Sequence, residues 1–393
     1  MADCVKAITC PRSNDKTVKH LVIVNRMGTS YTLIQNAHRI LKAPYRVLRL
    51  ARGRARMIIV AGLSLAVLVC YAVVHCGLLC QQVGLLSDTL ENEIIATLIP
   101  GETSNFMIMK PAWEPEVKPD IFTLVLIISA PGNKRQRNAI RRTWGRAENW
   151  DCLRLYTNHE EYSYQSVFMV GSTTDAVDNF VMDEAETYND LLLGNFNDTY
   201  SNLLFKSLMG LSWASNVVNC SYVIKTDDDV YLNMPKILQW LQTKNKTARL
   251  YAGKVASGWS PIRDPSNKNF IPYTDYAKKT LPDFCPGTFY VLSRNILHFL
   301  LGVARFIKPL QTEDVYIGML VQAIGLDPVK VPLVKNYVDA NEKALDVSLC
   351  RLHTYSAITH NLTPATIRKV HFRMMVSYAM SRSKSQRLCR RHR

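Results

Sequence analysis

Apolar runs of two lengths stand out along the chain. The longest, residues 57–80, holds no Asp, Glu, Lys or Arg over 24 residues. At about 1.5 Å per residue, a helix of this length exceeds the roughly 30 Å hydrocarbon core of a bilayer. The flank before it, residues 42–56, carries six Lys or Arg, and acids follow it. By the positive-inside rule, this pattern predicts a single-pass anchor with a cytoplasmic N-terminus.

Shorter apolar runs alternate with helical patterns from residue 120 onward. A continuous apolar run at 121–130, bounded by Pro119 and Pro131, is typical of a strand buried on both faces. Further strands are expected at 166–172 and 221–225, and helices at 134–145, 197–218 (capped by Asn197 or Asp198), 234–242 and from Glu313 to Gly325. Strands alternating with helices predict an α/β fold with a mostly parallel central sheet. Such sheets bind ligands beyond the carboxyl ends of their strands.

Composition divides the chain into five zones. They are a basic tail (1–56), the membrane segment (57–80), a polar, proline-spaced stem (81–119), a compact domain (120–378) and a second basic tail (379–393). The net charge is +16, of which residues 1–56 contribute +10 and residues 368–393 contribute +9. Because the body between them is close to neutral, we expect no nucleic-acid binding.

The predicted topology places the body in an oxidising compartment, where cysteines can pair. The disulfide candidates are four cysteines with three possible pairings, namely Cys152, Cys220, Cys285 and Cys350. For Cys285 we favour a structural disulfide. Four N-x-[ST] sequons begin at Asn197, Asn219, Asn245 and Asn361. We expect glycans at Asn197 and Asn245, whereas a disulfide at Cys220 would leave Asn219 unmodified.

Three consecutive carboxylates, Asp227, Asp228 and Asp229, follow the expected strand at 221–225. A solvated acidic turn accommodates such a sequence, but apolar residues on both sides keep this loop short. Like charges this close repel, and a divalent cation relieves the repulsion. Carboxylates suit Mg²⁺ or Mn²⁺, which complete their shells with phosphate oxygens. The D-x-D pattern therefore predicts a metal–diphosphate site. An aspartyl-phosphate phosphatase shares the pattern, but that class expects Thr or Val where this chain has Tyr231.

Two other charged motifs leave alternatives open. Glu313 and Asp314 begin an expected helix, where the helix dipole alone favours acids, yet one of them could serve as a general base. Arg137, Arg141 and Arg142 lie in a basic helix after the first strand. They fit equally well as partners of a nucleotide phosphate and as a solvated helix face.

Taken in order, these motifs resemble the β-1,3-galactosyltransferase / β-1,3-N-acetylglucosaminyltransferase family of Golgi enzymes (glycosyltransferase family 31). The matching blocks span roughly residues 120–375 and read RNAIRRTWG, NDTYSNLLFK, KTDDDVY, SPIRDPSNK, DFCPGTFYVLS, EDVYIG and SLCRLHTYSAITHNLTP. The resemblance implies a glycosyltransferase-A type nucleotide-binding fold, a UDP-sugar donor and Mn²⁺. It also implies a single-pass type II protein of the Golgi membrane with a lumenal catalytic domain.

The resemblance implies roles for individual residues. Asp227 and Asp229 become metal-motif carboxylates, and Asp314 becomes the general base. His360 becomes a metal ligand, with His353 as the competing candidate. A glycan on Asn361 would crowd that site, so either the sequon is unused or His360 is not a ligand. The implied donor-binding residues are Asp228, Arg137, Arg141, Lys206 and Glu313.

The resulting hypothesis is an inverting β-1,3-glycosyltransferase that transfers a hexose, preferably galactose, to a glycan acceptor on glycoprotein or glycolipid. N-acetylglucosamine transfer is the first alternative. A non-catalytic, sugar-binding member of the same fold is the second, which the presence of Asp227, Asp229 and Asp314 disfavours. Pro286 and Thr288-Phe289 replace a Gly-rich stretch of the family, so the resemblance says least about specificity. A homodimer is the assembly we would look for.

Overall fold

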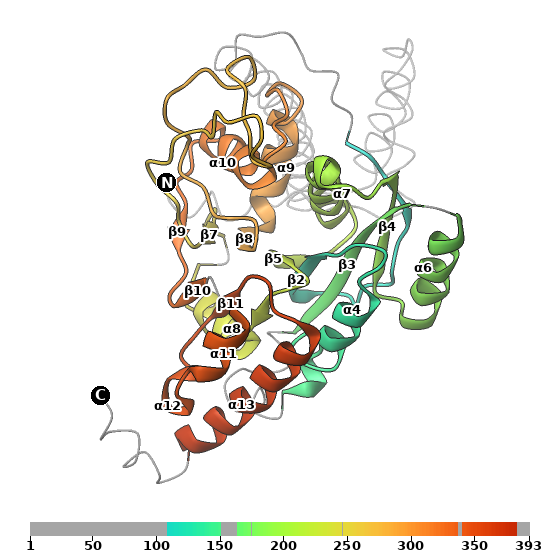
Figure 1. The fold of residues 1–393 in the computed structure, drawn as a ribbon, viewed down its shortest axis with the longest axis vertical. Helices are drawn as coiled ribbons and strands as arrows, with labels where there is room; N and C mark the ends of the chain where they lie inside the picture. Colours follow the sequence, from blue (N-terminus) through green and yellow to red (C-terminus); the bar gives the residue numbers. More distant parts are fainter. Residues whose placement is uncertain (1–107, 151–162, 174, 246, 337–339, 383–393) are drawn as a thin grey trace, which may run out of the picture. The chain divides into compact units, whose positions relative to one another are not determined.

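The computed structural model describes residues 108–150, 163–173, 175–245, 247–336 and 340–382 (Figure 1). The predicted anchor, the stem up to residue 107 and the last eleven residues lie outside this part of the chain. Among the helices that the structure describes, none is both long enough and apolar enough to cross a bilayer. The predicted zone boundaries therefore stay predictions.

An eight-stranded mixed sheet forms the centre of the fold, in the order β1-β4-β3-β2-β5-β8-β7-β9. Its strands are β1 (Pro111–Trp113), β2 (Ile121–Ile128), β3 (Tyr164–Ser172), β4 (Leu191–Asn197), β5 (Cys220–Asp227), β7 (Tyr251–Gly253), β8 (Phe289–Ser293) and β9 (Val329–Lys330). Strands β4, β3, β2 and β5 run parallel, and β8 runs antiparallel to both of its neighbours. The predicted α/β fold with a mostly parallel sheet is confirmed.

Helices cover both faces of this sheet. They are α4 (Lys134–Arg141), α6 (Asp175–Tyr188), α7 (Leu203–Asn216), α8 (Met234–Gln242), α9 (Arg294–Val303), α10 (Glu313–Ala323), α11 (Ala340–Asp346), α12 (Leu349–Leu352) and α13 (Pro364–Arg382). Alternate side chains of β2 enter two separate cores. Val125 and Ile127 belong to the core that includes side chains of α4, α8 and α13, whereas Leu124 and Leu126 belong to the core that includes side chains of α7, α9 and α10. Strand β2 is therefore buried on both faces, as its sequence predicts.

A second, three-stranded sheet brings distant segments together at one edge. It has the order β10-β11-β6, where β6 is Tyr231–Leu232, β10 is Val334–Asn336 and β11 is Ala357–Thr359. Tyr231 pairs with Ile358. The residues that follow β11 consequently lie beside the residues that precede β6, namely the triple aspartate.

The helix predicted at 197–218 begins later than expected. Asn197 is the last residue of β4, where it pairs with Ser172, and a short 3₁₀ turn at Tyr200–Asn202 precedes α7. The side chain of Asn202 donates to the carbonyl of Asn197 at 2.8 Å, so this turn closes on the strand end. Helix α8 has the predicted bounds, with Asn233 as its cap. Strand β4 and helix α6 were not expected from the sequence.

The disulfide predicted at Cys285 is wrong, and so is one at Cys220, because both residues are free, buried thiols. The β5–β8 register pairs Tyr222 with Ser293 and Thr226 with Phe289. Cys220 therefore lies at one end of this strand pair and Cys285 beyond the other, too far apart to bond. Burial raises the pKa of each thiol to about 12.

The other predicted modifications remain predictions. Cys350 is disulfide-bonded, whereas Cys152 lies outside the described residues, so the pairing of these two cysteines is untested. Asn197 and Asn245 are exposed, as glycan attachment requires.

Candidate active site

Strand β5 runs through the middle of the sheet and delivers the three aspartates at its carboxyl end. Strand β5 ends at Asp227, and Asp228 and Asp229 form the turn that follows it. Asp228 is buried, whereas the side chains of Asp227 and Asp229 are 28% and 24% exposed. The sequence thus places two carboxylates at an open edge and anchors the loop through the third.

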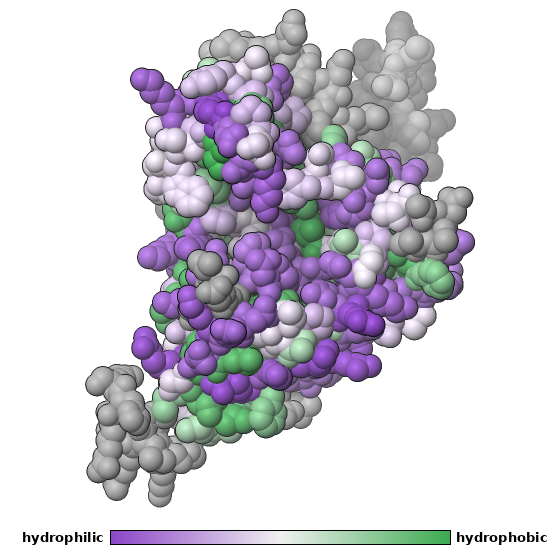
Figure 2. Space-filling model, in the orientation of Figure 1, coloured by the Kyte–Doolittle hydropathy of each residue, from purple (hydrophilic) through white to green (hydrophobic). Residues whose placement is uncertain are grey.

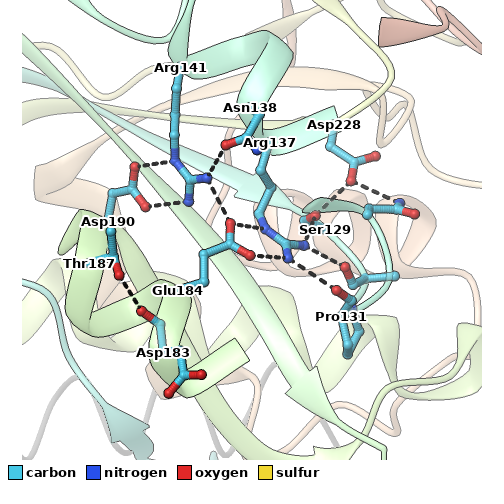
Figure 3. A network of polar contacts seen from close by, with 12 residues as sticks. Ser129, Pro131, Arg137, Asn138, Arg141, Asp183, Glu184, Thr187, Asp190 and Asp228 are labelled. Atoms are coloured by element: carbon cyan, nitrogen blue, oxygen red, sulfur yellow. Dashed lines mark hydrogen bonds and ion pairs between the residues drawn. The ribbon is translucent and has the colours of Figure 1, made fainter. Parts of the chain in front are cut away.

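Asp228 ties the loop to the end of the neighbouring strand, β2. Its Oδ2 accepts from Ser129 Oγ at 2.7 Å and from Asn133 Nδ2 at 3.0 Å (Figure 3). Burial raises the pKa of Asp228 to about 6, although both hydrogen bonds oppose the shift. Asp228 therefore fixes the position of its two neighbours.

Asp229 lies against the turn that follows β11. Its Oδ2 accepts from the backbone N–H of Asn361 at 2.9 Å, and its carbonyl accepts from Leu362 N at 3.0 Å. His360 Nδ1 lies 3.7 Å from the same Oδ2. His360 and Asn361 both have positive φ angles, 112° and 58°, which non-glycine residues rarely adopt. This strained turn holds the imidazole beside the carboxylate.

The Asp229–His360 pair fits a divalent cation. Asp229 Oδ1 and His360 Nδ1 are buried atoms that have no hydrogen-bond partner among the described residues, and buried polar atoms are seldom left so. No three His, Cys, Asp or Glu side chains of the described chain are gathered closely enough to hold a metal by themselves. One oxygen and one nitrogen ligand suit a Mg²⁺ or Mn²⁺ ion that takes its other ligands from water and phosphate.

The competing histidine, His353, lies in different surroundings. Its Nδ1 contacts Ser377 Oγ of α13 at 3.0 Å. Burial lowers the pKa of His353. Of the two histidines, His360 is therefore the one beside a carboxylate of the triple aspartate, and its role as a ligand stays a prediction.

The first turn of α10 is connected to β5 by a buried lysine. Lys225 Nζ lies 3.2 Å from Asp227 Oδ1 and 3.3 Å from Glu313 Oε2, and it donates to the carbonyl of Gly287 at 2.6 Å. Glu313 Oε1 accepts from Tyr290 at 2.7 Å. Burial alone would lower the pKa of Lys225, but the charges of Asp227 and Glu313 outweigh it and raise the pKa. Sequence analysis missed Lys225, although a lysine inside an apolar strand was a signal of a buried partner.

Asp314 is the next residue along α10 and remains partly exposed. Its Oδ2 accepts from the N–H of Gly287 at 3.0 Å, and its Oδ1 accepts from Val315 N at 2.9 Å. Burial, and then the charge of Glu313, raises the pKa of Asp314. A carboxylate that is oriented by two N–H groups and has a raised pKa is suited to accept a proton.

Tyr200 is a further residue of this edge that sequence analysis did not single out. Burial raises the pKa of its phenol, and the charges of Asp314 and Asp227 raise it further. Its hydroxyl donates to Asn269 Oδ1 at 2.7 Å. The sequence feature that could have identified Tyr200 is its position within the block NDTYSNLLFK.

The predicted donor-binding arginines are buried in an ion-pair network (Figure 3). Arg137 donates to both carboxylate oxygens of Glu184, at 2.9 and 2.8 Å, and to Ser129 Oγ at 3.0 Å. Arg141 donates to Asp190 at 2.8 and 2.7 Å and to Glu184 at 2.7 Å. The alternative of a solvated helix face is therefore wrong for both residues. Arg137 reaches Asp228 only through Ser129, and a contact of either arginine with the donor stays a prediction.

Lys206, the remaining predicted donor-binding cation, is also buried. Its Nζ donates to both oxygens of Asp198 at 2.7 Å and to the carbonyl of Ser129 at 2.9 Å. It joins α7 to the ends of β2 and β4, and its contact with a donor is likewise untested.

Comparisons with known proteins agree with this geometry. A family model described as Galactosyltransferase matches residues 135–332. Beta-1,3-galactosyltransferase 1 of mouse and of human is 29% identical over 253 residues, which cover 63% of this chain and 72% of the relative. Human beta-1,3-galactosyltransferase 5 is 29% identical over 207 residues, covering 52% of this chain and 64% of the relative.

Solved structures show a more distant likeness. The WbbM bifunctional glycosyltransferase covers 68% of this chain and 53% of its own, at a TM-score of 0.37 and 11% identity. The mannosyltransferase PcManGT from Pyrobaculum calidifontis, solved with GDP-Man and Mn²⁺, covers 63% and 62%, at a TM-score of 0.32 and 11% identity.

Proposed function

The chain belongs to the galactosyltransferase family and is a glycosyltransferase, and from this premise we propose that it is an inverting β-1,3-galactosyltransferase using a UDP-sugar donor. One observation carries the proposal. At the carboxyl end of β5, a carboxylate–imidazole pair with orphaned buried atoms lies at the same sheet edge as Asp314, a partly exposed carboxylate with a raised pKa. A metal–diphosphate site beside a base is what sugar transfer from a nucleotide donor requires.

In this proposal, Asp229 and His360 would hold Mn²⁺, and Asp227 would be the second carboxylate of the metal motif beside them. When bound, the cation neutralises negative charge that develops on the departing UDP. Lys225 holds Asp227 in place from inside the sheet. Asp228 fixes the loop through Ser129 and Asn133.

Asp314 acts as the general base. The acceptor hydroxyl loses its proton to Asp314 while its oxygen bonds to the anomeric carbon of the donor. The bond from that carbon to the UDP oxygen breaks, and its electron pair leaves with UDP. Because attack comes from the face opposite UDP, an α-linked donor gives a β-linked product. The chain needs no covalent nucleophile for this single displacement.

The proposal includes the topology that the sequence predicts, a type II protein of the Golgi membrane with a lumenal catalytic domain. N-acetylglucosamine remains the alternative donor sugar. The turn beside Asp314 consists of Pro286, Gly287 and Thr288. This turn is where the sequence of the chain departs from the family pattern. The donor preference is therefore left to experiment.

The test uses the full chain, purified in detergent, with Mn²⁺ and each of four donors: UDP-Gal, UDP-GlcNAc, UDP-GalNAc and UDP-Glc. UDP release is measured with and without methyl β-glycosides of Gal, GlcNAc, GalNAc and Man. We expect release from UDP-Gal that needs both an acceptor and the metal, and a β-1,3 linkage by NMR of the product. Asp229→Ala should abolish it, and Asp327→Ala, at an exposed carboxylate, should not. Binding of UDP and Mn²⁺ without any transfer would instead support the sugar-binding alternative.

A further inference from the structure

The connection between β7 and β8, residues 254–288, carries aromatic side chains that are open to solvent. Trp259 is 57% exposed and Tyr273 is 68% exposed, and Tyr200, from the 3₁₀ turn before α7, is 45% exposed. Burial of such large rings is favourable, so several exposed rings near one site require an explanation. Figure 1 shows this connection in yellow and orange, extending beyond the sheet near α9 and α10.

The backbone around Tyr273 is crosslinked by Arg263. Arg263 donates to the carbonyls of Ile271, Tyr276 and Lys278 at 2.6, 2.7 and 3.1 Å. Its guanidinium carbon lies 4.0 Å from the centroid of the Tyr273 ring. Rings that are already fixed lose little conformational entropy when a ligand binds.

Trp259 is linked to the candidate base by a short packed path. Its ring meets Phe284 edge to face, with centroids 5.8 Å apart. Phe284 packs on α10 so closely that a Cβ at Gly318 would lie 2.6 Å from the Phe284 Cβ. Gly287 is three residues after Phe284 in the sequence, and its N–H donates to Asp314.

The same connection reaches the active site a second time, through Tyr200. The hydroxyl of Tyr200 donates to Asn269, and burial, followed by the charges of Asp314 and Asp227, raises the pKa of its phenol. Two of the exposed rings therefore belong to this connection, and the third, Tyr200, contacts it at Asn269 and Lys268.

The connection also carries polar side chains. Lys268 lies 5.5 Å from the Tyr200 centroid, and Ser257 donates to the exposed Asp283 at 2.9 Å. The upper left of Figure 2, where this connection lies, is mostly hydrophilic and carries no broad apolar patch. Protein partners favour a contiguous apolar centre. Separated rings among hydrogen-bonding groups suit a pyranose instead, because it has apolar C–H faces and a rim of hydroxyls.

We propose that Trp259, Tyr273 and Tyr200 form a subsite for the inner sugar rings of an oligosaccharide acceptor, the rings beyond the one that carries the attacking hydroxyl. This inference rests on the proposed function and deepens it: the acceptor is an oligosaccharide rather than a single sugar. Trp259 takes the ring next to the accepting sugar, and Tyr273 takes one further out.

The experiment compares two kinds of acceptor on the full chain in detergent. One is the methyl β-glycoside of Gal, GlcNAc, GalNAc or Man. The other carries the same terminal sugar β-linked to methyl galactoside. We expect Trp259→Ala to raise KM for the disaccharide about fivefold to tenfold while KM for the monosaccharide changes less than about twofold. Trp259→Phe should recover most of the loss. Phe180→Ala removes an equally exposed ring (69%) from α6 and should change neither KM.

A ratio of disaccharide to monosaccharide kcat/KM that stays at the wild-type value in Trp259→Ala and in Tyr273→Ala overturns the inference. If Trp259→Ala melts at a much lower temperature, the inference is judged on Tyr273→Ala alone. The ratio of kcat/KM values is then measured with a trisaccharide in place of the disaccharide. A change in self-association without a change in the ratio also overturns it, since the rings would then serve a second copy of the chain.

If the wild type transfers sugar to no acceptor, the proposed function fails, and ligand-detected NMR still tests the subsite. With UDP and Mn²⁺ present, we expect saturation transfer from the protein to protons of the inner galactose, lost in Trp259→Ala. An absent signal, or one that Trp259→Ala leaves unchanged, overturns the inference independently of turnover.

Discussion

Two clusters of charged residues meet at the end of β2, and they differ in how completely they are paired. The arginine network (Arg137, Arg141, Glu184 and Asp190) is closed. Both oxygens of Glu184 and both oxygens of Asp190 accept from guanidinium groups at 2.7 to 2.9 Å. The arginine side chains are almost wholly buried.

The carboxylate edge (Asp227–Asp229, Glu313, Asp314 and His360) is open. The side chain of His360 is 43% exposed. Two buried polar atoms of this cluster, Asp229 Oδ1 and His360 Nδ1, have no hydrogen-bond partner among the described residues. Both clusters contain residue types that a sequence reader would assign to a nucleotide. A closed network holds the fold, because desolvated charges must find partners. An open cluster keeps polar atoms without hydrogen-bond partners, and a ligand can bind to these atoms.

The largest expected effect is at the open cluster. Asp314→Asn should lower kcat by about 10³-fold, because it removes the proton acceptor. The amide oxygen can still accept from Gly287 but the amide nitrogen cannot accept from Val315, while burial no longer opposes a charge, so the melting temperature should change little. Turnover and thermal unfolding of the same sample check this. A loss of less than tenfold would remove Asp314 from the role of base.

The closed cluster should respond in the opposite way. Arg137→Met should reduce the free energy of unfolding by about 3–5 kcal/mol, because Glu184 would remain buried with only Arg141 as its partner. Arg142 adjoins Arg141 in the sequence and is exposed. The free energy of unfolding of Arg142→Met should therefore stay within about 0.5 kcal/mol of the wild-type value. Chemical denaturation measures both. If Arg137→Met unfolded like the wild type yet lost UDP binding, the network would have to be reassigned to the donor.

Local pattern was sufficient for the parts of the site that lie within one element. The apolar run of β2, the bounds of α8, and three aspartates at the end of a strand are features of consecutive residues. So is Asp314 in the first turn of α10. Hydrophobic period and helix-start chemistry act over a few residues, and a single sequence displays them directly.

Partners that are distant in sequence could not be predicted in this way. Arg137 is explained by Glu184, 47 residues later on α6, a helix that the sequence analysis did not expect. His360 lies beside Asp229 because β6 pairs with β11 across more than a hundred residues. Cys285 is not bonded to Cys220 for the same kind of reason, since the β5–β8 register separates the two residues. These relations depend on tertiary pairing, which composition and spacing do not encode.

The open cluster should also set the pH dependence of turnover. Burial first and the charge of Glu313 second raise the pKa of Asp314, while Gly287 N–H and Lys225 oppose them. The base must be ionised to act, so kcat should fall as the pH drops through this raised pKa, above the range of an ordinary aspartate. Glu313→Gln removes the like charge and should move the acidic limb of the profile to lower pH. Profiles of kcat for the two proteins test this, and a limb that stays in place or moves upward would contradict it.

Ser129 contacts both clusters through its hydroxyl, and removal of that hydroxyl should give the smallest effect. Its hydroxyl donates to Asp228 and accepts from Arg137. Ser129→Ala should cost about 1 kcal/mol of stability, the usual net value of a hydrogen bond, and raise KM for the UDP-sugar about twofold to fivefold by loosening the loop that Asp228 anchors. Ser166→Ala is the matched control, because it deletes a buried hydroxyl that has no hydrogen-bond partner among the described residues. If Ser129→Ala lowered stability but left KM unchanged, the closed network would support the fold without positioning the open edge, and the two clusters would be neighbours without being coupled.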